Sequence, residues 1–144
     1  MVLPNLPPDD LWPLKQDNAD ALFDWVFAPW IKEIELTDFV VRKGFRSLRL
    51  PLNDRLKFFS GASCGRAVMA AIDTVASMAM ATAPRRGKGT VYQHTHFLRP
   101  AANDDFLIAA TVKRFGKVSA DVDCSMTFVT SGELVADAVL EFAF

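Results

Sequence analysis

The feature that most constrains this chain is an apolar run from Ala67 to Ala83 that contains a single ionisable residue, Asp73. The run has 17 residues, which is the short limit for a membrane-spanning helix, and a carboxylate in its middle would be costly in lipid. A helix that is apolar on nearly every side is typical of a helix buried inside a protein. We therefore predict a buried helix from about Gly65 to Ala83, ended by Pro84 and covered by a sheet.

The rest of the second half of the chain alternates between apolar and polar residues, as strands with one buried face do. The clearest case is Val118 to Phe128, where every second residue is apolar. Similar patterns predict strands at residues 90–98, 106–115 and 134–144. Earlier in the chain, residues 31–42 and 45–52 flank Lys43-Gly44, a pair typical of a hairpin turn. Short connections among the last strands favour antiparallel pairing.

Before these strands, residues 1–15 are rich in proline and are expected to be irregular. Asp17 or Asn18 is placed to cap a helix that runs to about Ala28, where Pro29 ends it. We expect this helix to bury Leu22, Trp25 and Val26. The order of elements predicts an α+β fold in which one antiparallel sheet wraps around one long helix, with an extra N-terminal helix. A chain of 144 residues suits one domain, and we assign residues 1–144 to it.

Composition narrows the classes of partner. The net charge is −1, from 16 basic and 17 acidic residues, so the whole chain has no basic footprint for nucleic acid. The chain begins without the charged and apolar regions of a signal peptide, and its two cysteines do not suggest a disulfide framework. We therefore expect a cytoplasmic protein that binds neither nucleic acid nor membrane.

Several short motifs follow one another in an order that resembles a known family. Gly61-Ala62-Ser63-Cys64-Gly65-Arg66 opens the predicted helix, and Asp73 lies nine residues beyond Cys64. Pro100-Ala101 ends one strand, and Gly116-Lys117 separates the next two. The region from residue 60 onward resembles the PaaI-like, or 4-hydroxybenzoyl-CoA thioesterase-type, hotdog acyl-CoA thioesterases. In that family a His-Gly-Gly triplet opens the helix. Here Cys64 stands at the His position, Arg66 at the second Gly, and Phe58 where many relatives have Asn.

The resemblance implies a function and a set of roles. The expected reaction is hydrolysis of an acyl-CoA, with CoA as part of the substrate and without a metal or other cofactor. Asp73 would be the general base or nucleophile, the Gly65 amide would polarise the thioester carbonyl, and Thr90 would orient water or the carboxylate. The resemblance also implies a homodimer or a dimer of dimers, with each site shared between subunits. The residues expected to contact substrate are Cys64, Arg66, Phe58, Phe59, Arg114 and Lys117.

The residue types agree with this chemistry, and they also leave alternatives. A helix N-terminus offers unpaired N–H groups to a developing oxyanion, and glycine lets a ligand approach them closely. A carboxylate on an apolar helix needs partners, so Asp73 could instead be a structural group, paired for example with Arg66. The departures from His-Gly-Gly favour a second hypothesis, a non-catalytic acyl-CoA or acyl-ligand binder. A hotdog hydratase ranks last, because its Asp/His motif is missing.

Cys64 and the two histidines suggest two further readings. A cysteine nucleophile normally needs a His base, and His94 and His96 are the only histidines in the chain. The same pair, on one face of a strand, could also ligate a metal. Without a further ligand cluster we expect neither, and we interpret Cys64 as a small buried residue.

Overall fold

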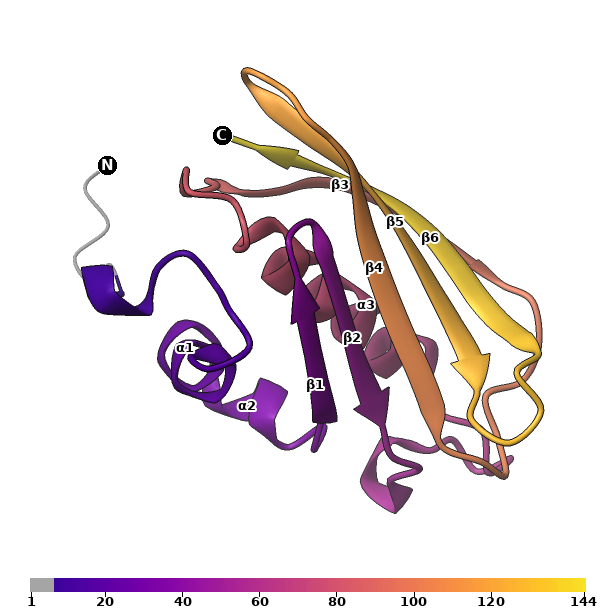
Figure 1. Ribbon diagram of the computed structural model, residues 1–144. Helices are drawn as coiled ribbons and strands as arrows, with labels where there is room; N and C mark the ends of the chain where they lie inside the picture. Colours follow the sequence, from indigo (N-terminus) through magenta and orange to yellow (C-terminus); the bar gives the residue numbers. More distant parts are fainter. Residues whose placement is uncertain (1–6) are drawn as a thin grey trace.

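A computed structural model of the chain describes residues 7–144 and shows a six-stranded antiparallel sheet with one long helix against it (Figure 1). The helix, α3 (Gly65–Met80), crosses one face of the sheet. The strands are β1 (Thr37–Arg42), β2 (Phe45–Leu50), β3 (Gly89–Phe97), β4 (Phe106–Phe115), β5 (Ser119–Phe128) and β6 (Leu134–Ala143). Their order across the sheet is β1-β2-β4-β5-β6-β3. The predicted fold class is confirmed.

The core lies between α3 and the inner face of the sheet. Ala71, Ile72, Val75 and Ala79 of α3 are fully buried, because the helix is apolar on the sides that meet the sheet. The alternating residues of the strands meet them, as the period of two predicts. These buried strand residues include Leu48, Ile108, Val122, Met126 and Leu140. Within residues 7–144, no helix is long and apolar enough to cross a membrane.

The N-terminal segment differs from the prediction. The capped helix is shorter, α1 (Ala19–Val26), and Asn18 precedes it without a side-chain cap. Pro29 ends α1 but also starts α2 (Pro29–Lys32), because its fixed φ suits the first position of a helix. The predicted strand at residues 31–42 therefore begins only at Thr37. Apart from residues 1–6, which lie outside the described part, the predicted irregular segment holds one 3₁₀ turn, η1 (Asp9–Leu11).

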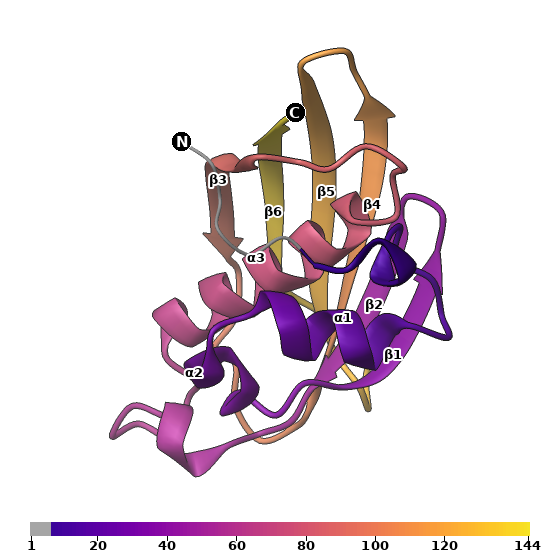
Figure 2. The same ribbon diagram turned by 90° about the vertical axis from the view of Figure 1, so that its left-hand side faces the viewer.

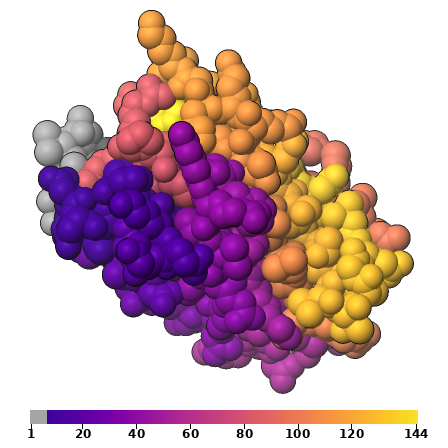
Figure 3. Space-filling model, in the orientation of Figure 1, coloured from indigo at the N-terminus to yellow at the C-terminus, as the bar shows by residue number. Residues whose placement is uncertain are grey.

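The burial of α1 was only partly predicted. Leu22 is fully buried, but Trp25 and Val26 are 41% and 47% exposed, and Phe23 is buried instead. Figure 2 shows the reason: α1 lies in front of α3, so one side of α1 faces inward and the other faces solvent. The N–H of Leu14 donates to the carbonyl of Ala81 over 2.8 Å and ties this segment to the end of α3. In the space-filling view the segment joins the β1–β2 hairpin in one continuous surface (Figure 3).

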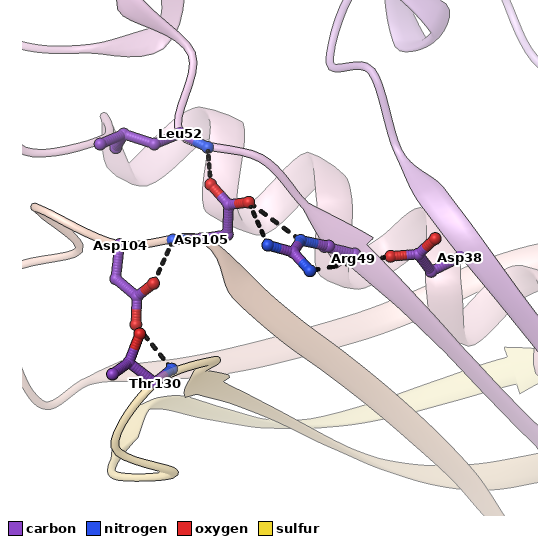
Figure 4. Close-up of polar contacts among 6 residues, drawn as sticks. All are labelled: Asp38, Arg49, Leu52, Asp104, Asp105 and Thr130. Atoms are coloured by element: carbon purple, nitrogen blue, oxygen red, sulfur yellow. Dashed lines mark hydrogen bonds and ion pairs between the residues drawn. The ribbon is translucent and has the colours of Figure 1, made fainter.

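The loops at one end of the sheet are joined by two neighbouring carboxylates (Figure 4). Asp105 accepts hydrogen bonds from the N–H of Leu52 at 2.9 Å and from Nη2 of Arg49 at 2.7 Å. Asp104 accepts a hydrogen bond from the N–H of Thr130 at 2.8 Å. The bond from Leu52 and that from Arg49 lower the pKa of Asp105, and the bond from Thr130 lowers that of Asp104. The end of β2, the start of β4 and the β5–β6 turn are thereby fastened together.

Candidate functional site

The first turn of α3 presents unpaired backbone donors. Cys64 precedes the helix in an extended conformation, and its own N–H donates to the carbonyl of Leu56 over 2.7 Å. Within residues 7–144 the N–H groups of residues 65–67 donate no hydrogen bond. These groups also carry the positive end of the helix dipole. This arrangement is suited to an oxygen that gains negative charge, which is the role predicted for Gly65.

Phe97 lies against Gly65 and was missed by the sequence analysis. A Cβ atom added to Gly65 would lie 3.4 Å from Cζ of Phe97, an ordinary contact distance, so the fold itself does not demand glycine here. The Phe97 side chain is 53% exposed, although it is on the face of β3 that looks toward α3. The alternation of β3 did not reveal that Phe97 faces α3, because a bulge between Thr90 and Tyr92 adds one residue. After this bulge, the strand residues that face α3 are those that a regular strand would turn away from it.

Asp73 and Thr90 are joined directly. The hydroxyl of Thr90, at the start of β3, donates a hydrogen bond of 2.6 Å to a carboxylate oxygen of Asp73 in the middle of α3. Asp73 is half-buried, and Thr90 is exposed. The expected alternative, a pair between Asp73 and Arg66, is absent from the described residues: Arg66 is exposed and forms no ion pair there. Asp73 is therefore left with one hydroxyl partner and an open side.

Gly65 and Asp73 are too far apart to act on one thioester within a single copy. Asp73 lies eight positions after Gly65 on α3, which corresponds to about 12 Å along the helix axis. The two ends of β3 lie beside different residues of α3. Thr90, at its start, bonds to Asp73, and Phe97, at its end, lies against Gly65. The residues predicted for one site thus lie in two separate places on a single chain.

The two histidines lie on the other face of the sheet. His94 is opposite Val139 and His96 is opposite Asp137, on the side away from α3 and Cys64. Nε2 of His94 is 2.9 Å from Nε2 of His96, and Nδ1 of His96 is 3.1 Å from Asp137. The expectation that the histidines do not serve Cys64 agrees with this placement. Residues 7–144 hold no group of three or more His, Cys, Asp or Glu side chains placed for a metal ion.

The two cysteines differ in their surroundings. Cys124 is buried on the inner face of β5, and burial, with a smaller contribution from Asp123, raises the pKa of its thiol to about 12. Cys64 is only half-buried, so it is less enclosed than the small buried residue that we expected. Both thiols are free.

The other predicted substrate residues fall into two separate regions. Phe58 and Phe59 are exposed in the loop before α3, where the N–H of Phe58 donates to the carbonyl of Ala62 over 2.8 Å. Arg114 and Lys117 are instead near the β4–β5 turn, at the opposite end of α3. Arg114 is paired with Asp121 at 3.2 Å, and the carbonyl of Lys117 accepts a hydrogen bond from Arg85 at 2.6 Å. The structure does not bring Arg114 and Lys117 to the Gly65 end of the same chain.

Comparison with known proteins identifies the class. Residues 52–133 match the thioesterase superfamily, and this match covers more than half of the chain. The chain belongs to the thioesterase superfamily. A comparison with curated proteins finds no match.

Solved structures of the same fold are distant in sequence. Zebrafish thioesterase superfamily member 2 superimposes with a TM-score of 0.80 at 18% identity, over 90% of this chain and 98% of that one. The Escherichia coli PaaI protein of the phenylacetic acid degradation operon gives 0.74 at 17% identity, over 89% and 94%. A Streptococcus mutans protein with bound acetyl-CoA gives 0.65 at 20% identity, over 74% and 86%. The likeness to these proteins confirms the hotdog fold.

Proposed function

We propose that this protein is an acyl-CoA thioesterase in which Asp73 promotes attack of water on the thioester. The observation that carries the proposal is the 2.6 Å hydrogen bond from Thr90 to Asp73, in the open middle of an otherwise apolar helix. A carboxylate oriented by one hydroxyl, with its other oxygen unbonded within residues 7–144, is suited to take a proton from water. Membership of the thioesterase superfamily and the acetyl-CoA held by the Streptococcus mutans protein support a CoA thioester as substrate.

The reaction proceeds in two steps. Asp73 removes a proton from water while the oxygen of that water bonds to the thioester carbon, and the carbonyl oxygen becomes an oxyanion held by the Gly65 N–H. When this intermediate collapses, the carbon–sulfur bond breaks and the sulfur takes the proton from Asp73. The products are a carboxylic acid and free CoA. Direct attack by the Asp73 carboxylate, followed by hydrolysis of the anhydride, is the alternative route.

The distance of about 12 Å between Gly65 and Asp73 requires a second copy of the chain. An antiparallel arrangement of two α3 helices would set Gly65 of one copy beside Asp73 of the other. The edge of the sheet supports this arrangement, because among residues 7–144 β3 pairs only with β6 and leaves its other edge open. Val91 and Tyr92 on this strand are 64% and 51% exposed. A dimer joined through β3 would cover this edge and complete two sites.

The decisive experiment measures release of the CoA thiol from short, long and aromatic acyl-CoAs by the wild type and by Asp73→Asn. We expect the substitution to lower kcat by about 10²- to 10⁴-fold, because it removes the proton acceptor. Asp123→Asn is the matched control, since Asp123 lies on the outer face of the sheet beside Lys113 and should leave kcat unchanged. Equal turnover by Asp73→Asn and the wild type would contradict the proposal.

The second candidate is a protein that binds acyl-CoA without hydrolysing it. It is favoured by the exposed guanidinium of Arg66 at the helix N-terminus, where the family has glycine. This candidate predicts saturable binding of acyl-CoA with no thiol release. Light scattering tests the arrangement in which two chains share each site. A monomer at all concentrations would exclude that arrangement.

A further inference from the structure

A pocket lies between the N-terminal segment and the C-terminal half of α3. Its volume is about 330 Å³, which falls within the range of small-molecule sites. The pocket is lined by Leu22, Trp25 and Val26 of α1, by Met78 of α3 and by Phe142 of β6. The side chains of Trp25 and Val26, which the sequence had led us to expect in the core, line this pocket instead.

The pocket reaches the candidate site through two residues. Ser77 lies one helical turn beyond Asp73 on α3, and residues four apart share a face of a helix. Gly89 precedes Thr90, the hydrogen-bond partner of Asp73. Ser77 and Gly89 both line the pocket. A group held at Asp73 can therefore extend along α3 into the pocket after about one turn, or about 5.4 Å.

The chemistry of the walls selects an apolar occupant. Apart from Ser77, the polar side chains among the described residues that line the pocket are Arg86 and Lys88, which come from the loop between α3 and β3. Arg86 is occupied: it donates to the carbonyl of Pro7 and to Asp9, each at 3.1 Å, and it stacks 5.1 Å from the Trp12 ring. Arg86 thus holds the N-terminal segment in place beside the pocket. Lys88 is exposed and forms no ion pair within residues 7–144, and the other lining side chains are apolar or aromatic.

We propose that this pocket binds the hydrocarbon tail of the acyl group, so that the protein acts on straight-chain acyl thioesters of medium length or longer. The inference rests on the proposed function, because the position of the tail follows from a thioester at Asp73. The N-terminal segment is then a specificity element: Trp12, Trp25 and Val26 set the length of chain that fits. Each methylene buried in the pocket strengthens binding about fourfold until the pocket is full.

Tryptophan fluorescence can report binding in this pocket. The chain has three tryptophans, of which Trp12 and Trp25 line the pocket, whereas Trp30 does not and is 57% exposed. In a Trp30→Phe background, titration with sodium decanoate below its micelle concentration should change the fluorescence saturably. Sodium acetate should leave the signal unchanged. The blocking variant is Val26→Phe, and the matched control is Val40→Phe, because Val40 is equally exposed, at 45%, on β1 and away from the pocket.

Kinetics complete the test. Across a series from acetyl- to dodecanoyl-CoA, kcat/KM of the wild type should rise with chain length, and Val26→Phe should shift the optimum to shorter chains. Val40→Phe should match the wild type in both assays. An unchanged fluorescence signal with decanoate, or a chain-length profile that Val26→Phe does not move, would overturn the inference. Saturable decanoate binding without any thiol release would support tail binding in the pocket and contradict thioester hydrolysis. The two proposals can therefore fail independently.

Discussion

The hydroxyl of Thr90 donates a 2.6 Å hydrogen bond to Asp73 and connects the start of β3 to the middle of α3. Thr90 lies seventeen positions after Asp73 in the chain. Thr90 faces α3 because of the bulge that follows it in β3. This contact defines one half of the candidate site.

Replacing Thr90 with Val should lower kcat by about 10- to 100-fold, because a hydrogen bond to a charged group contributes about 1.5–3 kcal/mol. Thr90→Ser keeps the hydroxyl and should retain most of the activity. The check is steady-state release of CoA thiol by both variants. A Val variant as active as the Ser variant would mean that the hydroxyl does not orient Asp73.

Replacing Gly65 with Ala should leave stability nearly unchanged, because the added Cβ meets Phe97 at an ordinary 3.4 Å. The same methyl group would lie where a thioester approaches the first turn of α3, and small displacements at a reacting centre cost about 10²-fold in rate. Thermal unfolding and kcat, measured on one preparation, check the prediction. A large fall in Tm would instead show that Gly65 is needed for folding.

Arg46 on β2 is a charged group buried in the fold. It is fully buried, its three side-chain nitrogens donate no hydrogen bond within residues 7–144, and its guanidinium lies 4.6 Å from the Phe39 ring. Burial lowers its pKa to about 10, so it remains charged at pH 7. Arg46→Met should therefore stabilise the fold by about 1 kcal/mol or more. Urea unfolding tests this, and a loss of several kcal/mol would show that the guanidinium has polar partners.

The Asp105 cluster predicts a response to acid. The folded state lowers the pKa of this carboxyl, so its stabilising contribution is complete above the unfolded pKa of about 3.9 and is lost as the pH falls through the folded value. Asp105→Asn should lower Tm by about 3 °C at pH 7, and the difference from the wild type should shrink below about pH 4. A difference that stays constant down to pH 2.5 would exclude the carboxylate as its source.

The two thiols should react at very different rates. Cys124 is buried and has a raised thiol pKa of about 12, whereas Cys64 is half-buried. An aromatic disulfide reagent should label one thiol per folded chain promptly, and the second only after unfolding. Cys64→Ser should remove the prompt reaction. Loss of thioester hydrolysis in this variant would revive a cysteine nucleophile, whereas unchanged hydrolysis agrees with Asp73.

Local pattern was enough to predict most of the elements. The apolar run around Asp73 had to be a buried helix, and the alternation at residues 118–128 had to be a strand, because each pattern depends only on neighbours along the chain. Gly65, Asp73 and Thr90 were named from motif order. Pro29 was misread as a simple stop, because a proline that ends one helix can also start another.

Tertiary structure decided what these residues face. No local signal pairs β3 with β6 or places a bulge after Thr90, and these two features determine that Thr90 meets Asp73 while His94 and His96 look away. Nor does any local pattern turn Trp25 and Val26 toward a pocket. The sequence by itself determined most of the elements, the apolar faces of α3 and β5, and the candidate chemistry. Only the packing of distant segments decided which groups meet, because those contacts depend on residues far apart in the chain.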